Sequence, residues 1–204
     1  MTLVELTVVI GVISFVLVGL CEMYFAVSRE WERQQGQGAA LDATSQACAR
    51  LNDYISQATD ALPIIRPGQS DCLAVNLPAD QAHGIYVPAP SGGELLYRTG
   101  TWILFYLSDS TGGYTRNGNI LWCGTIPSPA QASTVVPDSN WSLYGNGAGK
   151  ITPISSMQFS LDASGLRKAV TATVTSAYTI NQVTRGQGQL QQNITVCLSN
   201  NGPE

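Results

Sequence analysis

An uncharged apolar segment near the N-terminus constrains this chain more than any other feature. No side chain between Leu6 and Cys21 is charged, and the apolar character continues to Val27 with Glu22 as the one interruption. A helix needs about 20 such residues to span the hydrocarbon core of a bilayer. The sequence therefore predicts a helix over residues 1–28 whose surroundings are a membrane or other apolar helices.

Two common kinds of apolar segment fit this one poorly. A secretory signal peptide has a basic region before its apolar run and small residues at its cleavage site. Here the first basic residue is Arg29, and the run leads into Cys21-Glu22-Met23-Tyr24-Phe25. A plain signal anchor normally carries positive charges that set its orientation. Both difficulties disappear if a basic leader has already been removed from a longer precursor.

Glu5 is an acidic residue at the start of this apolar helix. A charged side chain inside a spanning segment costs about 2.5–3.5 kcal/mol and indicates a functional partner. The nearest basic side chain is Arg29, about 36 Å away along a helix, whereas the α-amine of Met1 is close. Glu5 could neutralise the amine of its own chain or of an adjacent copy. The second arrangement would set the stagger between identical helices, because other registers leave two charges unpaired. The alternative is a glutamate near the headgroups that pairs with nothing.

The run Met1-Thr2-Leu3-Val4-Glu5-Leu6, followed by an apolar helix, resembles the mature N-terminus of type IV pilins and type II secretion pseudopilins. The resemblance implies that a prepilin peptidase removes a short leader and that Met1 is then N-methylated. It implies that Glu5 pairs with the N-terminal amine of a neighbouring subunit during assembly. It also implies storage in the bacterial inner membrane, then assembly by a platform protein into an extracellular filament or a periplasmic pseudopilus. The partners would be further copies or other pilins.

Residues 29–62 are expected to continue the helix in amphipathic form. Pro63 is a natural stop. Gly36 and Gly38 each cost a helix about 1 kcal/mol, so we expect a weak point there. The apolar stripe, spaced at three or four residues, consists of Leu41, Cys48, Leu51, Ile55, Ala58 and Leu62, with Thr44 filling the gap.

Residues 63–204 are expected to form a β-rich globular domain, because helical periodicity ends and short β-rich runs alternate with turn residues. The expected fold class is α+β, with the long N-terminal helix packed on an antiparallel sheet, as the resemblance to pilins also implies. The expected strands are Cys72–Leu77, Gly84–Val87, Leu95–Arg98, Trp102–Leu107, Asn119–Gly124, Ser155–Asp162, Ala169–Thr179 and Leu190–Leu198.

The stretch Trp102–Cys123 is similar to J-type pseudopilins and W-type minor pilins. This similarity implies a low-copy protein that primes or caps a filament.

The chain has five cysteines, and none belongs to a CxxC pair. This spacing argues against zinc, thioredoxin-like and haem-attachment sites. Cys21 lies in the apolar segment and is expected to be free. The other four residues allow three disulfide connectivities. We favour Cys48 with Cys72 and Cys123 with Cys197, and the alternative is that one or both pairs are reduced and buried.

Charge and composition narrow the function. With 10 basic and 14 acidic residues, the net charge is −4, which argues against binding nucleic acid through phosphate contacts. The single histidine, His83, leaves little scope for acid–base or metal chemistry, so we expect no enzymatic activity, cofactor or metal. Trp141 and Tyr144, in a loop rich in Ser, Gly and Asn, are candidates for surface recognition.

These observations leave three functions open. The first is a structural subunit of a type IV pilus or similar filament. The second is a low-copy minor pilin or pseudopilin that primes or caps a filament. The third is a membrane-anchored periplasmic domain that binds a ligand or acts as an enzyme. Adhesion, motility, DNA uptake and protein secretion all remain possible outputs.

Overall fold

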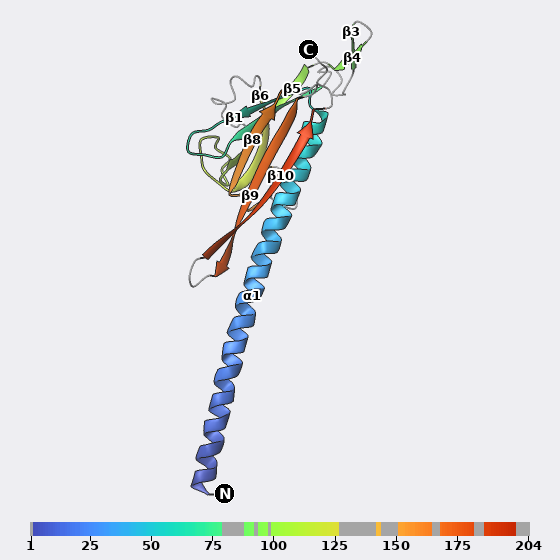
Figure 1. The fold of residues 1–204 in the computed structure, drawn as a ribbon. Helices are drawn as coiled ribbons and strands as arrows, with labels where there is room; N and C mark the ends of the chain where they lie inside the picture. Colours follow the sequence, from blue (N-terminus) through green and yellow to red (C-terminus); the bar gives the residue numbers. More distant parts are fainter. Residues whose placement is uncertain are drawn as a thin grey trace. The chain divides into compact units, whose positions relative to one another are not determined.

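The computed structural model describes residues 2–78, 88–91, 94–97, 99–126, 142–143, 151–164, 168–181 and 186–198. The chain forms two compact units. One contains α1 up to Gly38 and the adjoining ends of β9 and β10, and the other begins at Ala39 and contains the remaining strands. The elements (Figure 1) are α1 (Leu3–Gln57), β1 (Asp60–Ile64), β2 (Cys72–Pro78), β3 (Pro88–Ser91), β4 (Glu94–Tyr97), β5 (Thr99–Ser108), β6 (Ile120–Ile126), β7 (Ser142–Leu143), β8 (Ser156–Asp162), β9 (Ala169–Asn181) and β10 (Gly186–Cys197).

The α+β architecture expected from the sequence is confirmed, and it is pilin-like: one long N-terminal helix packs on antiparallel sheets. α1 continues through Gly36 and Gly38, so the expected weak point does not interrupt it. The helix ends at Gln57 rather than at residue 62. There the chain joins the sheet, and the Thr59 amide donates to the Asn76 carbonyl at 2.9 Å.

β1 was not expected, because Leu62 continues the helical spacing of the preceding residues. Among the described strands it lies at the edge of its sheet and pairs only with β2. Pro63 fits there because an edge strand does not need every amide for pairing. Leu62 is 39% exposed, so placing it in the buried helical stripe was wrong.

The largest sheet has the strand order β1-β2-β5-β6-β7, and its neighbouring strands are antiparallel. Its strands β2, β5 and β6 match the expected runs, whereas β1 and β7 were not expected. The run expected at Leu95–Arg98 appears as β4, which pairs with the unexpected β3. The run expected at Gly84–Val87 lies outside the described residues. The expected strands near the C-terminus appear as β8, β9 and β10, which form a second sheet in the order β10-β9-β8.

The main core lies between α1 and the inner faces of both sheets. Small residues make up most of the buried helical stripe. Leu41, at the margin of this stripe, is 51% exposed, so its expected burial was wrong. The buried helix residues are Ala40, Ala43, Thr44, Ala47, Cys48, Leu51 and Ile55.

A second core covers the opposite face of the five-stranded sheet. Strand alternation sends Leu73 and Phe105 to the main core, and Cys72 and Tyr106 to the second one. The connection between β5 and β6 folds over this second face and contributes Tyr114. Burial on both faces explains why β2, β5 and β6 read as nearly continuous apolar runs rather than as alternating ones.

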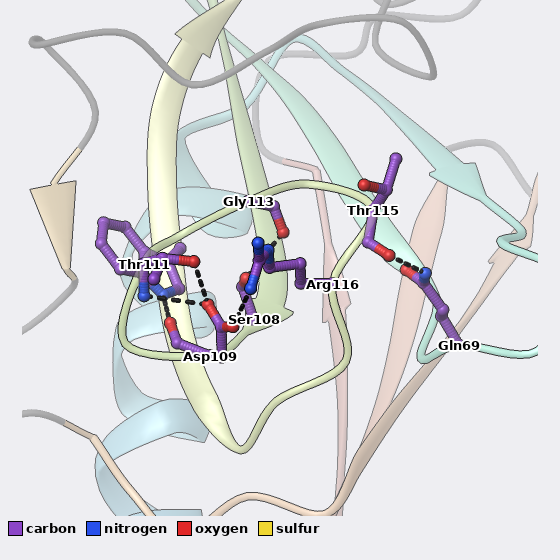
Figure 2. Close-up of polar contacts among 8 residues, drawn as sticks. Gln69, Ser108, Asp109, Thr111, Gly113, Thr115 and Arg116 are labelled. Atoms are coloured by element: carbon purple, nitrogen blue, oxygen red, sulfur yellow. Dashed lines mark hydrogen bonds and ion pairs between the residues drawn. The ribbon is translucent and has the colours of Figure 1, made fainter.

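The β5–β6 connection is held by its own polar contacts (Figure 2). Asp109 accepts hydrogen bonds from the amide of Thr111 at 2.9 Å and from its hydroxyl at 2.5 Å. The Ser108 hydroxyl donates to the Gly113 carbonyl at 2.7 Å. Asp109 therefore stabilises a turn, and these hydrogen bonds hold its pKa below the usual range.

Gly118, at the end of this connection, provides a test of the packing. A Cβ atom there would lie 1.9 Å from the Ser108 carbonyl carbon, whereas a Cβ at Gly38 meets nothing within 4 Å. We expect Gly118→Ala to lower the free energy of unfolding by several kcal/mol, because backbone must move. Gly38→Ala should raise it by up to about 1 kcal/mol. Thermal unfolding of the full chain in detergent micelles measures both, and equal stability of the two variants would contradict the described loop geometry.

Candidate functional site

The candidate site is the apolar surface of α1 in the first unit. Its large apolar side chains between Leu3 and Val27 are between 44% and 82% exposed. The segment has a mean hydropathy of 2.6 over its best window, and none of that window is buried. Soluble monomers rarely leave a continuous apolar surface of this kind uncovered. By length and composition the helix suits membrane anchoring or a secretion signal.

Thr2 and Glu5 form a reciprocal cap at the start of α1. The Thr2 amide donates to Glu5 Oε2 at 2.7 Å, and the Glu5 amide donates to Thr2 Oγ1 at 3.4 Å. This is the capping-box arrangement, in which a threonine and a glutamate three residues later satisfy each other's backbone amides. An acidic group at a helix N-terminus is further stabilised by the helix dipole.

The cap gives Glu5 a role within its own chain that the sequence reasoning missed. The signal was present, because a threonine followed three positions later by a glutamate before an apolar run is a capping pattern. Met1 lies outside the described residues, so pairing of Glu5 with an N-terminal amine stays a prediction. The two roles involve different parts of one group, since a carboxylate has two oxygens that can each accept.

The first unit also ties α1 to the adjoining ends of β9 and β10. Gln37 Nε2 donates to the Tyr178 hydroxyl at 2.8 Å. The Tyr178 ring packs against Gly188, where a Cβ atom would lie 2.4 Å from the ring. Charged residues appear on α1 after the apolar segment, and Arg33 pairs with Glu30 at 3.6 Å. This ion pair is exposed, so it contributes little stability.

No disulfide joins the five cysteines, which differs from both favoured pairings. Cys48 belongs to the main core and Cys72 to the second core, so the sheet separates them. Cys123 packs against the main core, whereas Cys197 is exposed on β10 next to the inward-facing Val196. Strand alternation therefore turns one member of each pair away from the other.

The remaining candidates cannot be joined into a site from the described residues. His83, Trp141 and Tyr144 lie outside the described residues, so recognition by the two aromatic residues stays a prediction. Asp162 accepts from the Ser164 amide at 2.9 Å and from its hydroxyl at 2.6 Å, which identifies it as a turn residue. Within the described ranges, no group of three His, Cys, Asp or Glu side chains is arranged to hold a metal ion.

Comparisons of the chain with protein-family models, with curated proteins and with solved structures found no match. The pilin-like architecture rests on the arrangement of the helix and sheets.

The cap predicts how the first turn of α1 responds to substitution. Thr2→Val and Glu5→Ala should each destabilise that turn by about 1 kcal/mol, because each leaves a backbone amide without its acceptor. Glu5→Gln should leave it nearly unchanged, since glutamine also serves in a capping box. Hydrogen exchange of the first-turn amides in detergent micelles measures this. Thr7→Val is the control, because the Thr7 hydroxyl bonds to the Val4 carbonyl and takes no part in the cap. Faster exchange in Glu5→Gln than in Glu5→Ala would contradict the cap.

The cysteine geometry predicts that all five cysteines carry thiols and that none is in a disulfide. Denatured protein alkylated without reductant should take up five groups, read as intact mass. In the folded chain Cys72 should react slowly, because it is buried and burial raises its pKa to about 11. The exposed Cys197 serves as the reactive reference. Uptake of fewer than five groups would reveal a disulfide and contradict the described strand faces.

Proposed function

We propose that this chain is a non-enzymatic structural subunit of a type IV pilus or pilus-like filament. The observation that carries the proposal is the exposed apolar surface of α1. Glu5 lies at the start of this surface, and the later part of the same helix packs on the sheets of a pilin-like fold. A membrane stores this surface before assembly, and the apolar helices of other copies cover it afterwards.

The physical drive for assembly is burial of aliphatic surface in the filament core. Apolar area removed from water contributes roughly 25 cal/mol per Å², although a membrane-embedded helix has already gained most of this. Packing between helices and correct register then decide the arrangement. In the proposal Glu5 sets the register by pairing with the N-terminal amine of a neighbouring copy.

The helix cap is compatible with this pairing. Glu5 Oε2 accepts from the amide of Thr2, and the other carboxylate oxygen remains for a partner's ammonium group. The cap holds the carboxylate at the helix start in a defined position. A preorganised group loses less conformational entropy when it binds.

The proposal includes partners and a location that follow from the family resemblance. A prepilin peptidase would generate the N-terminal amine, and a platform protein would extract the subunit from the inner membrane. The filament would be extracellular, or periplasmic in a secretion pseudopilus. A low-copy minor subunit would use the same N-terminal interactions.

The test compares two substitutions at Glu5 in cells that make the filament. Glu5→Gln keeps the helix cap but removes the charge, whereas Glu5→Ala removes both. If charge pairing sets the register, both variants should lose at least about tenfold of the filament in the sheared surface fraction, while membrane levels stay normal. The control is Glu22→Gln, which removes one carboxylate from the same helix without touching the cap.

Three results would contradict the proposal. Filament yield in Glu5→Gln equal to the unsubstituted chain would show that the charge has no role in register. Loss in Glu5→Ala alone would assign the effect to the helix cap. Equal loss in Glu22→Gln would make the effect one of general charge rather than of a specific pair.

A further inference from the structure

The globular unit contains a pocket that has no part in the proposed assembly. Its volume is about 370 Å³, and its walls come from the β1–β2 connection, the β5–β6 connection with the end of β5, and the start of β8. The lining is rich in hydroxyl and amide groups, including those of Ser155, Asn117 and Gln158, and carries two opposite charges, on Arg66 and Asp71. Among the described residues, no aromatic side chain lines it.

Arg66 brings a nearly buried positive charge to this pocket. Arg66 is only 7% exposed. The guanidinium donates to the carbonyls of Ser70 at 2.8 Å, Tyr114 at 2.5 Å and Leu107 at 3.2 Å. It also lies 5.0 Å from the centre of the Tyr114 ring, a cation–π arrangement.

All of these partners are neutral. Among the residues that the structure describes, no carboxylate lies within ion-pair distance of Arg66. The three hydrogen bonds use three of the five N–H donors that a guanidinium carries. A buried charge without an opposite partner is unfavourable, so Arg66 leaves a local positive potential that an anionic group would relieve.

Among the described residues of this pocket, one buried acceptor has no hydrogen-bond partner. Gln69 Oε1 is buried and has no hydrogen-bond partner, while its amide nitrogen donates to the Thr115 carbonyl at 2.6 Å (Figure 2). A buried unpaired acceptor costs about 1–3 kcal/mol in general. Asp71 adds a carboxylate on the same connection, and the bond described for this residue is made by its backbone amide, to the Met157 carbonyl at 3.0 Å.

We propose that this pocket binds a small zwitterion of the α-amino acid class. The ligand carboxylate lies toward Arg66, and the ligand ammonium lies toward Asp71 and Gln69 Oε1. The hydroxyl and amide groups of the lining accommodate a short polar side chain. The two opposite charges and the unpaired acceptor favour a zwitterion over a simple anion, and the lack of an aromatic wall disfavours a sugar, which usually stacks on one.

The inference is tested by calorimetric titration of the full chain in detergent micelles, so the outcome does not depend on filament assembly. The probes are L-alanine, L-serine and L-glutamine. The matched compounds are their N-acetyl derivatives, which lack the ammonium group, and ethylamine, which lacks the carboxylate. Glucose serves as the neutral polar compound. We expect at least one amino acid to bind, and its N-acetyl derivative and ethylamine to bind at least about tenfold more weakly.

A pair of variants locates the binding. Asp71→Asn should weaken amino-acid binding about tenfold or more. Asp53→Asn, which makes the same change on the exposed face of α1 outside the pocket, should leave binding unchanged. Thermal unfolding checks that both variants are folded, and Arg66 is left in place because its three carbonyl contacts hold the fold. Absence of binding by all three amino acids, equal binding of glucose or of the N-acetyl derivatives, or unaltered binding in Asp71→Asn would overturn the proposal.

Discussion

The apolar side chains of α1 must be covered along the whole helix, but their distribution around the helix axis changes along its length. From Ala40 onward the apolar residues lie on one stripe and are buried against the sheets, whereas from Leu3 to Val27 they lie on all sides and are exposed. In the part of the helix from Ala40 onward, the sheets cover the single apolar stripe. The earlier part needs apolar surroundings on every side, which a bilayer or a bundle of further helices provides.

The globular unit is organised around this buried stripe. The small Ala43 and Ala47 and the larger Leu51 and Ile55 of the helix share one core with strands from both sheets. The five-stranded sheet then needs a second cover on its other face, which the β5–β6 connection provides through Tyr114. Arg66 joins this cover to the sheet, because its guanidinium bonds to carbonyls of both Leu107 and Tyr114.

Much of the fold could be predicted from local patterns, and the errors have physical causes. Strands buried on one or both faces were recognisable because β-rich runs alternate with turn residues. The end of α1 was misplaced because Ala58 and Leu62 keep the helical spacing, and only the tertiary pairing of β1 with β2 shows that the chain has become a strand. Leu41 was predicted to be buried because it is a large aliphatic residue, whereas the neighbouring positions that are buried are the smaller Ala40 and Ala43.

For the candidate residues too, some properties could be predicted from the sequence and others required the folded structure. The importance of Glu5 was evident from its position in an apolar run, but its bond to the Thr2 amide required the geometry of the first turn. The cysteine pairings could not be deduced, because the face of a strand on which Cys72 lies depends on the register of the whole sheet. The polar pocket could not be predicted from the sequence, because folding alone brings Arg66, Asp71 and Gln158 together.

We propose above that other subunits cover the apolar surface of α1 in a filament. Quantitative mass spectrometry of sheared surface filaments, including the N-terminal peptide, tests it most directly. We expect the chain to be present in the filament fraction and to begin with an N-methylated Met1. Abundance would then distinguish a major subunit from a minor one, and a processed chain that stays with the cells would indicate a pseudopilus. A longer, unprocessed N-terminus, or absence of the chain from every filament, would contradict the claim.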